Sequence, residues 1–187
     1  MPYGGDKDNT GNVLVPEDFT QWANAGVTID PDVRTAPDGT TTADKITETA
    51  TNSNHPARRN FAALPAGAVQ FSAFLAAAER TCLTVLILSD LGGYATVHFD
   101  LATGTFAIGR NQLGVSASIH PAGDYHLVTV SLSSWPGGSG YTDFRLTNKT
   151  SVAAIGQAGD SYLGVAGSGI YAWGAKLAPV AQAAYLR

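Results

Sequence analysis

Apolar and polar residues alternate along much of the chain in short runs, which is the pattern of β-strands with one buried face. Apolar residues occupy every second position in 97–101, and the same pattern recurs in 128–132. A short Gly-containing stretch at 102–104 leads from the first run into another apolar run at 105–108. Residues 95–108 are therefore predicted to form a β-hairpin.

Further short runs predict more strands of the same kind. They occupy 13–15, 26–29, 43–48, 61–64, 83–88, 115–119, 144–147 and 169–177. Residues 69–80 include good helix formers, but their apolar positions alternate from 69 to 75, so we expect a strand there. A short helix is expected only at 179–186. The predicted fold is all-β, a two-sheet antiparallel β-sandwich or jelly roll with little helix.

Length and composition divide the chain into an arm and one domain. The 187 residues suit a single sandwich, which we place at 12–187, and the 21 glycines punctuate many turns. Residues 1–11 are mostly Gly, Asp and Asn and contain almost nothing apolar, so we expect an extended N-terminal arm. Ordering each backbone residue costs about 1–2 kcal/mol, so this arm needs a partner surface, with Pro2 and Tyr3 as its anchors.

Charge and cysteine content exclude several classes of function. The formal net charge is −4 and the 11 Lys and Arg residues are scattered, which is unlike a nucleic-acid-binding protein. The start of the chain is not basic and no apolar run is long enough for a membrane span, so we expect neither a signal peptide nor a membrane anchor. Cys82 is the only cysteine, which excludes an internal disulfide and a site built from several thiolates.

No motif of catalysis or metal binding stands out, so we expect no enzyme and no cofactor. The four histidines lack metal-ligand spacing, and no serine lies in a Gly-x-Ser-x-Gly elbow. Most of the acidic residues lie beside turns, where local turn chemistry explains them. Glu17 or Asp18 could offer one oxygen ligand to calcium, but 170–177 contains no acid to complete that site, so no calcium is expected.

The aromatic residues offer the best candidates for binding. Sugar recognition needs an exposed aromatic face with polar groups nearby. Tyr94 and His98 share one face of a predicted strand, and Trp135 and Tyr141 flank a Gly-rich stretch, so these four are the candidate glycan-binding residues. A neighbouring subunit could equally cover them. Trp22 and Trp173 have apolar neighbours and are instead expected in the core.

Several segments, taken in order, resemble the carbohydrate-binding-module-like, concanavalin-like jelly-roll domains of tailed-phage virion proteins. The matching segments are NVL at 12–14, EDF at 17–19 with Trp22, APDGTTTADKI at 36–46, FSAF at 71–74 with ER at 79–80, VHFDLATG at 97–104 and GIYAWGAKL at 169–177. The resemblance spans about 12–178 and implies a fold, because these segments carry no catalytic group. The chain departs from the pattern at 124–126 and in its Gly-rich stretch after Trp135.

Two functions follow from this resemblance. The first is a virion structural protein on the particle surface, as a head decoration or a tail or fibre component. It would dock through its N-terminal arm and assemble, as a homotrimer, with copies of itself and other virion proteins. The alternative is a non-catalytic glycan-binding module that attaches to a receptor or host surface. A module serving an enzyme would have a catalytic neighbour in its chain, and we expect this one to stand alone, which favours the structural role.

Overall fold

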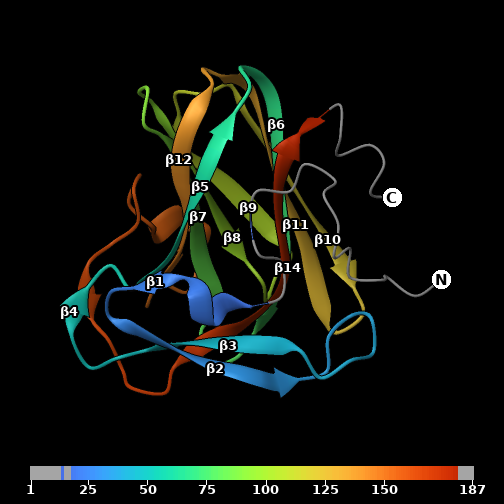
Figure 1. Cartoon of the computed structure of the whole chain (residues 1–187). Coiled ribbons are helices and arrows are strands. Elements are labelled where there is room, and N and C mark those ends of the chain that lie inside the picture. The colour runs from blue at the N-terminus through green and yellow to red at the C-terminus, as the bar shows by residue number, and fades with distance from the viewer. Residues whose placement is uncertain (1–13, 15–17, 181–187) are drawn as a thin grey trace.

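The computed structural model describes residue 14 and residues 18–180, in which the chain forms two antiparallel sheets stacked face to face (Figure 1). Sheet A has the strand order β1 (Ala23–Asn24), β5 (Pro56–Leu64), β12 (Gly138–Leu146), β7 (Cys82–Ser89), β8 (Tyr94–Asp100) and β9 (Thr105–Asn111). Sheet B has the order β10 (Val115–Ala122), β11 (Tyr125–Trp135), β6 (Gly67–Ala77), β14 (Gly169–Pro179), β3 (Ala43–Glu48) and β2 (Val27–Arg34).

Three short elements complete the described part of the chain. A two-stranded ribbon pairs β13 (Tyr162–Leu163) with β4 (Asn52–Ser53), and two 3₁₀ turns lie at η1 (Phe19–Gln21) and η2 (Val152–Ala154). Strands account for 61% of the structure and helix for 4%, which confirms the predicted β-sandwich of the jelly-roll type. No helix among the described residues is long and apolar enough to cross a membrane.

The core lies between the sheets and follows the alternation seen in the sequence. Val97 and Phe99 of β8 point inward from sheet A, while Val128 and Val130 of β11 point inward from sheet B, and all four are buried. Trp22 stacks on Phe144, with ring centroids 5.3 Å apart. Burial of these large apolar groups is the main source of stability for the fold.

Most of the predicted strands are confirmed. The hairpin expected at 95–108 is β8 and β9, which pair in antiparallel register. The ambiguous segment 69–80 is mostly strand β6, because β6 pairs with β11 on one side and β14 on the other, and this tertiary pairing overrides local helix propensity. The arm 1–11, most of the run 13–15 and all but the start of the helix expected at 179–186 lie outside the described residues.

The outer face of sheet B carries a second, smaller apolar cluster. Trp173 is the centre of it and is 4% exposed, while Trp22 in the main core is 2% exposed, so the prediction that both are buried is confirmed. The loop between β2 and β3 folds over this cluster, and the Trp173 indole donates a hydrogen bond to Thr42 Oγ1 at 3.0 Å. The same loop borders the groove that is described below.

Candidate functional site

The candidate residues Tyr94 and Tyr141 lie in one row on the outer face of sheet A. Leu88 of β7 stands between them, since it is the register partner of Tyr141 on β12 and of Tyr94 on β8. All three side chains are half-buried. The two tyrosines, 47 positions apart in the sequence, are therefore brought together by the pairing of three strands.

The other two candidates are buried, which corrects the expectation that their rings are displayed. His98 is 2% exposed and Trp135 is also 2% exposed. The Trp135 ring packs on Phe61 in the core, with centroids 5.6 Å apart, because β12 already begins at Gly138 and leaves no long loop to carry the indole outward. Neither ring offers a face to a sugar in this structure.

His98 is buried because a distant segment crosses the outer face of sheet A. We call residues 147–168 the strap; it contains η2 and β13. The strap lies against β8, where Thr96 Oγ1 donates to the Gln157 carbonyl, and against β12, where Arg145 Nη1 donates to the Ala158 carbonyl at 2.7 Å. Under the strap, His98 Nδ1 contacts Thr84 Oγ1 at 2.8 Å. Burial lowers the pKa of His98, against a weaker opposing effect of Asp160.

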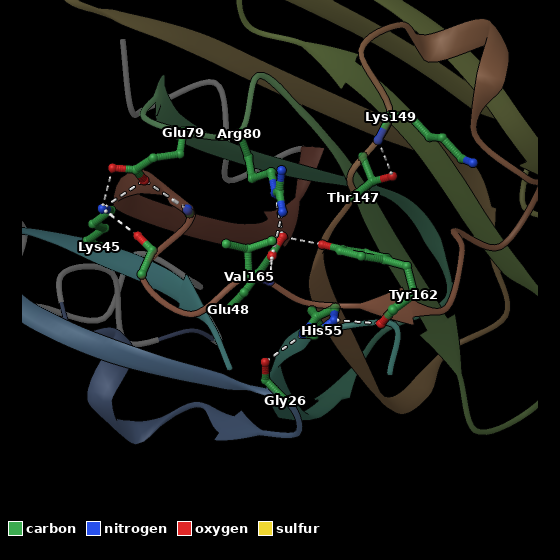
Figure 2. A network of polar contacts seen from close by, with 12 residues as sticks. Gly26, Lys45, Glu48, His55, Glu79, Arg80, Thr147, Lys149, Tyr162 and Val165 are labelled. Atoms are coloured by element: carbon green, nitrogen blue, oxygen red, sulfur yellow. Dashed lines mark hydrogen bonds and ion pairs between the residues drawn. The ribbon is translucent and has the colours of Figure 1, made fainter. Parts of the chain in front are cut away.

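A buried polar network ties the end of the strap to the rest of the molecule (Figure 2). Glu48 accepts two hydrogen bonds from Arg80, at 2.6 and 2.7 Å, and one from the Val165 backbone N–H at 2.9 Å. The Tyr162 hydroxyl also donates to Glu48. His55 contacts the carbonyls of Gly26 and Tyr162 through its two ring nitrogens, at 2.6 and 3.1 Å.

The charges of this network are matched, so it stabilises the fold and is not a reactive centre. Burial alone would raise the pKa of Glu48, but the hydrogen bonds from Arg80, Tyr162 and Val165 outweigh it and hold that pKa below its usual value. Burial and the Glu48 carboxylate raise the pKa of Tyr162 strongly. The phenol therefore stays protonated and remains a donor.

The outer face of sheet B carries a groove that the sequence did not reveal. It has a volume of about 480 Å³ and lies between the β2–β3 loop and the β10–β11 hairpin. Half-buried apolar groups form its floor, prolines form its walls and exposed polar groups stand at its rim: Phe74, Leu127, Pro37, Pro121, His120 and Asp124. This volume is within the range of small-molecule binding sites in proteins.

The two borders of the groove are linked to each other, so its shape is preformed. Tyr125, the first residue after the turn of the β10–β11 hairpin, donates through its hydroxyl to the Thr35 carbonyl at 2.9 Å. The Arg34 guanidinium lies over both the Tyr125 ring, at 5.0 Å, and the Tyr171 ring, at 4.7 Å. The turns at 36–39 and 121–124 are recognisable in the sequence, but only the strand order of sheet B shows that they face each other.

Among the described residues, no group of three or more His, Cys, Asp or Glu side chains is arranged to hold a metal ion. Asp18 caps η1 by accepting a hydrogen bond from the Thr20 N–H at 3.0 Å. The hydroxyl of Thr20 also bonds to Asp18, and these contacts lower the pKa of Asp18 despite the opposing effect of burial. A local turn thus explains this residue, while Glu17 lies outside the described residues.

No family model matches the chain, and no curated protein matches it. The solved structures that are similar to it include the following two. The first is the enzymatically active domain of tailspike protein 4 of bacteriophage CBA120, with a TM-score of 0.46, 12% identity and a match over 91% of this chain but 21% of the tailspike. The second is TmCBM61 in complex with β-1,4-galactotriose, with a TM-score of 0.35, 20% identity and coverage of 74% of this chain and 99% of the other. The chain spans about a fifth of the tailspike's length.

Proposed function

We propose that the chain is a non-catalytic glycan-binding module and that the groove on the outer face of sheet B takes an uncharged sugar. The observation that carries this proposal is the combination of a preformed groove of about 480 Å³ with an apolar floor and a polar rim. The C–H face of a pyranose ring packs on Phe74, Leu127 and the prolines, while its hydroxyls bond to rim groups. A neutral sugar is the expected ligand, because the Asp124 carboxylate at the rim would repel an acidic one.

The rim offers complementary hydrogen-bonding groups for sugar hydroxyls. Asp124 is an acceptor through its carboxylate, and His120 can donate or accept according to its tautomer. Both side chains are exposed on the β10–β11 hairpin, so their replacement removes binding groups without opening the core. A hydrogen bond to a charged group contributes roughly 1.5–3 kcal/mol, so loss of Asp124 should weaken binding about tenfold or more.

The test is retention on a panel of immobilised neutral oligosaccharides, including galactans, glucans and mannans. The wild type should bind at least one of them, and Asp124→Asn and His120→Ala should each weaken that binding about tenfold without moving the thermal transition. Asp90→Asn is the matched control, since Asp90 is also exposed on a hairpin turn but lies in the β7–β8 connection. Absence of binding across the panel, or equal binding by all variants, would refute the proposal.

In this proposal the module works on the outside of a phage particle, in a trimeric assembly held by residues 1–11. The support is the resemblance of segments 12–178 to phage jelly-roll domains, together with the composition of the arm. Deleting residues 1–11 should leave a folded domain that no longer copurifies with particles. Incorporation of the truncated chain at full occupancy would refute attachment through the arm. If the full chain is incorporated into particles but binds no glycan, its role is purely structural and the proposal of a glycan-binding module is refuted.

A further inference from the structure

The outer face of sheet A carries two neighbouring rows of side chains that run across the strands. One row contains Tyr141, Leu88 and Tyr94, as described above. The other contains Arg58, Asp143, Leu86, Thr96 and Arg110, which are successive register partners across β5, β12, β7, β8 and β9. The two arginines are thus at the two ends of the second row, and each leans toward a tyrosine of the first.

Each arginine stacks on the tyrosine nearest to it. The Arg58 guanidinium carbon is 3.7 Å from the centroid of the Tyr141 ring, and that of Arg110 is 5.2 Å from the centroid of the Tyr94 ring. The result is a band of five side chains, Arg58, Tyr141, Leu88, Tyr94 and Arg110, with one cation at each end. Adjacent strands are about 4.8 Å apart, so a band across five strands is about 19 Å long.

The band carries more positive charge than is needed to neutralise the buried carboxylate beside it. Asp143 is completely buried and already pairs with Arg145, at 2.9 Å, as well as with Arg58, at 2.6 Å. Arg58 uses Nε and Nη2 for this pair, so its Nη1 group is not engaged by Asp143. Arg110 Nη1 reaches the Gln157 side-chain oxygen only at 3.5 Å, and no carboxylate among the described residues pairs with this guanidinium, so its charge remains available to a ligand.

The strap leaves this band open along one side. Leu86 and Thr96 of the second row are buried beneath the strap, whereas Tyr141, Leu88 and Tyr94 of the first row remain half-buried. The edge of the strap at Gln157, whose side-chain oxygen is 3.5 Å from Arg110 Nη1, therefore forms a wall beside the band. An extended ligand can lie along this wall.

We propose that the band is a second binding site, separate from the groove, and that it takes an acidic polysaccharide. Sugar rings pack on the tyrosines and on Leu88, while carboxylate or sulfate groups that recur along the polymer reach the guanidinium groups at the two ends. The geometry favours an acidic ligand, because two arginines flank the band in a chain whose net charge is −4. The apolar centre of the band thus matches the sugar rings of such a polymer, and the two cationic ends of the band match its acidic groups.

The test uses affinity electrophoresis of the full chain in gels that contain polygalacturonate, alginate, hyaluronate or heparin. We expect retardation by at least one of these polymers, which falls as salt is added because the arginine contacts are screened. Arg110→Gln and Tyr94→Ala should each reduce the affinity about tenfold or more. Polygalacturonate with its carboxyl groups reduced to alcohols should retard the protein less than the acidic polymer does.

Arg34→Gln is the matched control, since it removes the same charge and also an arginine–tyrosine stack, but on the outer face of sheet B. It should leave the retardation unchanged. Thermal transitions of all variants check that the fold is intact. Absence of retardation by all four acidic polymers overturns the proposal, as does retardation that is lost in Arg34→Gln and kept in Arg110→Gln.

Discussion

Glu48 and Arg80, which are 32 residues apart, form a bidentate ion pair in which Nε and Nη2 of the arginine lie 2.6 and 2.7 Å from the two carboxylate oxygens. The Glu48 side chain is fully buried and that of Arg80 is 17% exposed. The same carboxylate binds Tyr162 and the Val165 N–H of the strap. One buried charge therefore holds β3, the β6–β7 connection and the strap together.

Replacement of Glu48 by glutamine should destabilise the protein substantially. The amide cannot neutralise Arg80, and it presents one acceptor where the carboxylate has two, so the arginine and the strap each lose a partner. Breaking a buried ion pair from one side costs roughly 3–5 kcal/mol, with the lower end expected because Arg80 retains some contact with solvent. The free energy of unfolding in urea measures this. Asp124→Asn, at an exposed turn position, should change it by less than about 0.5 kcal/mol.

The same pair predicts how stability depends on pH. The pKa of Glu48 is lower in the folded chain than its usual value of about 4.3, so the unfolded chain binds more protons in the acidic range. The contribution of ionised Glu48 is then fully present above pH ~4.3 and is lost as the pH falls through the folded pKa. Between pH 5 and 3, wild-type stability should fall more steeply than that of Glu48→Gln. Parallel curves would show that Glu48 does not cause the acid sensitivity.

The prediction of strands from the sequence was reliable because alternation is a local property that each strand carries by itself. The candidate binding sites were harder to predict from the sequence. The alternation in 97–101 correctly placed His98 on the face opposite to Val97, but it could not show that residues 147–168 return to cover that face. The groove likewise combines residues that are distant in the sequence, 35–37, 74, 120–125 and 127. Such sites depend on long-range topology, which no short pattern in the chain encodes.

Trp135, a candidate for sugar binding from the sequence, should affect stability and leave glycan retention largely intact. Its ring is 2% exposed and packs on Phe61, so Trp135→Ala should lower the free energy of unfolding by about 3–5 kcal/mol. Trp135→Phe should cost less, because Trp135 Nε1 has no hydrogen-bond partner among the described residues and phenylalanine removes that unpaired donor. Retention per folded molecule, measured at a temperature where both variants are folded, should match the wild type. If Trp135→Phe loses glycan retention while its stability is kept, Trp135 does contribute to glycan binding.

Gly109 on β9 should not tolerate a side chain, because the strap passes directly over it. A Cβ atom at this position would lie 2.3 Å from His98 Nε2, 2.7 Å from Thr96 Oγ1 and 2.8 Å from the Gln157 carbonyl oxygen. Gly109→Ala must therefore displace the strap or the imidazole, and overpacking of this kind costs roughly 1–3 kcal/mol. Removing the imidazole in the double variant Gly109→Ala/His98→Ala relieves the closest contact and leaves those with Thr96 Oγ1 and the Gln157 backbone. The two changes should thus destabilise the protein by less than the sum of their separate effects, with part of the Gly109→Ala penalty remaining. Urea unfolding of the four proteins measures this coupling, and strictly additive effects would show that the strap does not press His98 against β9.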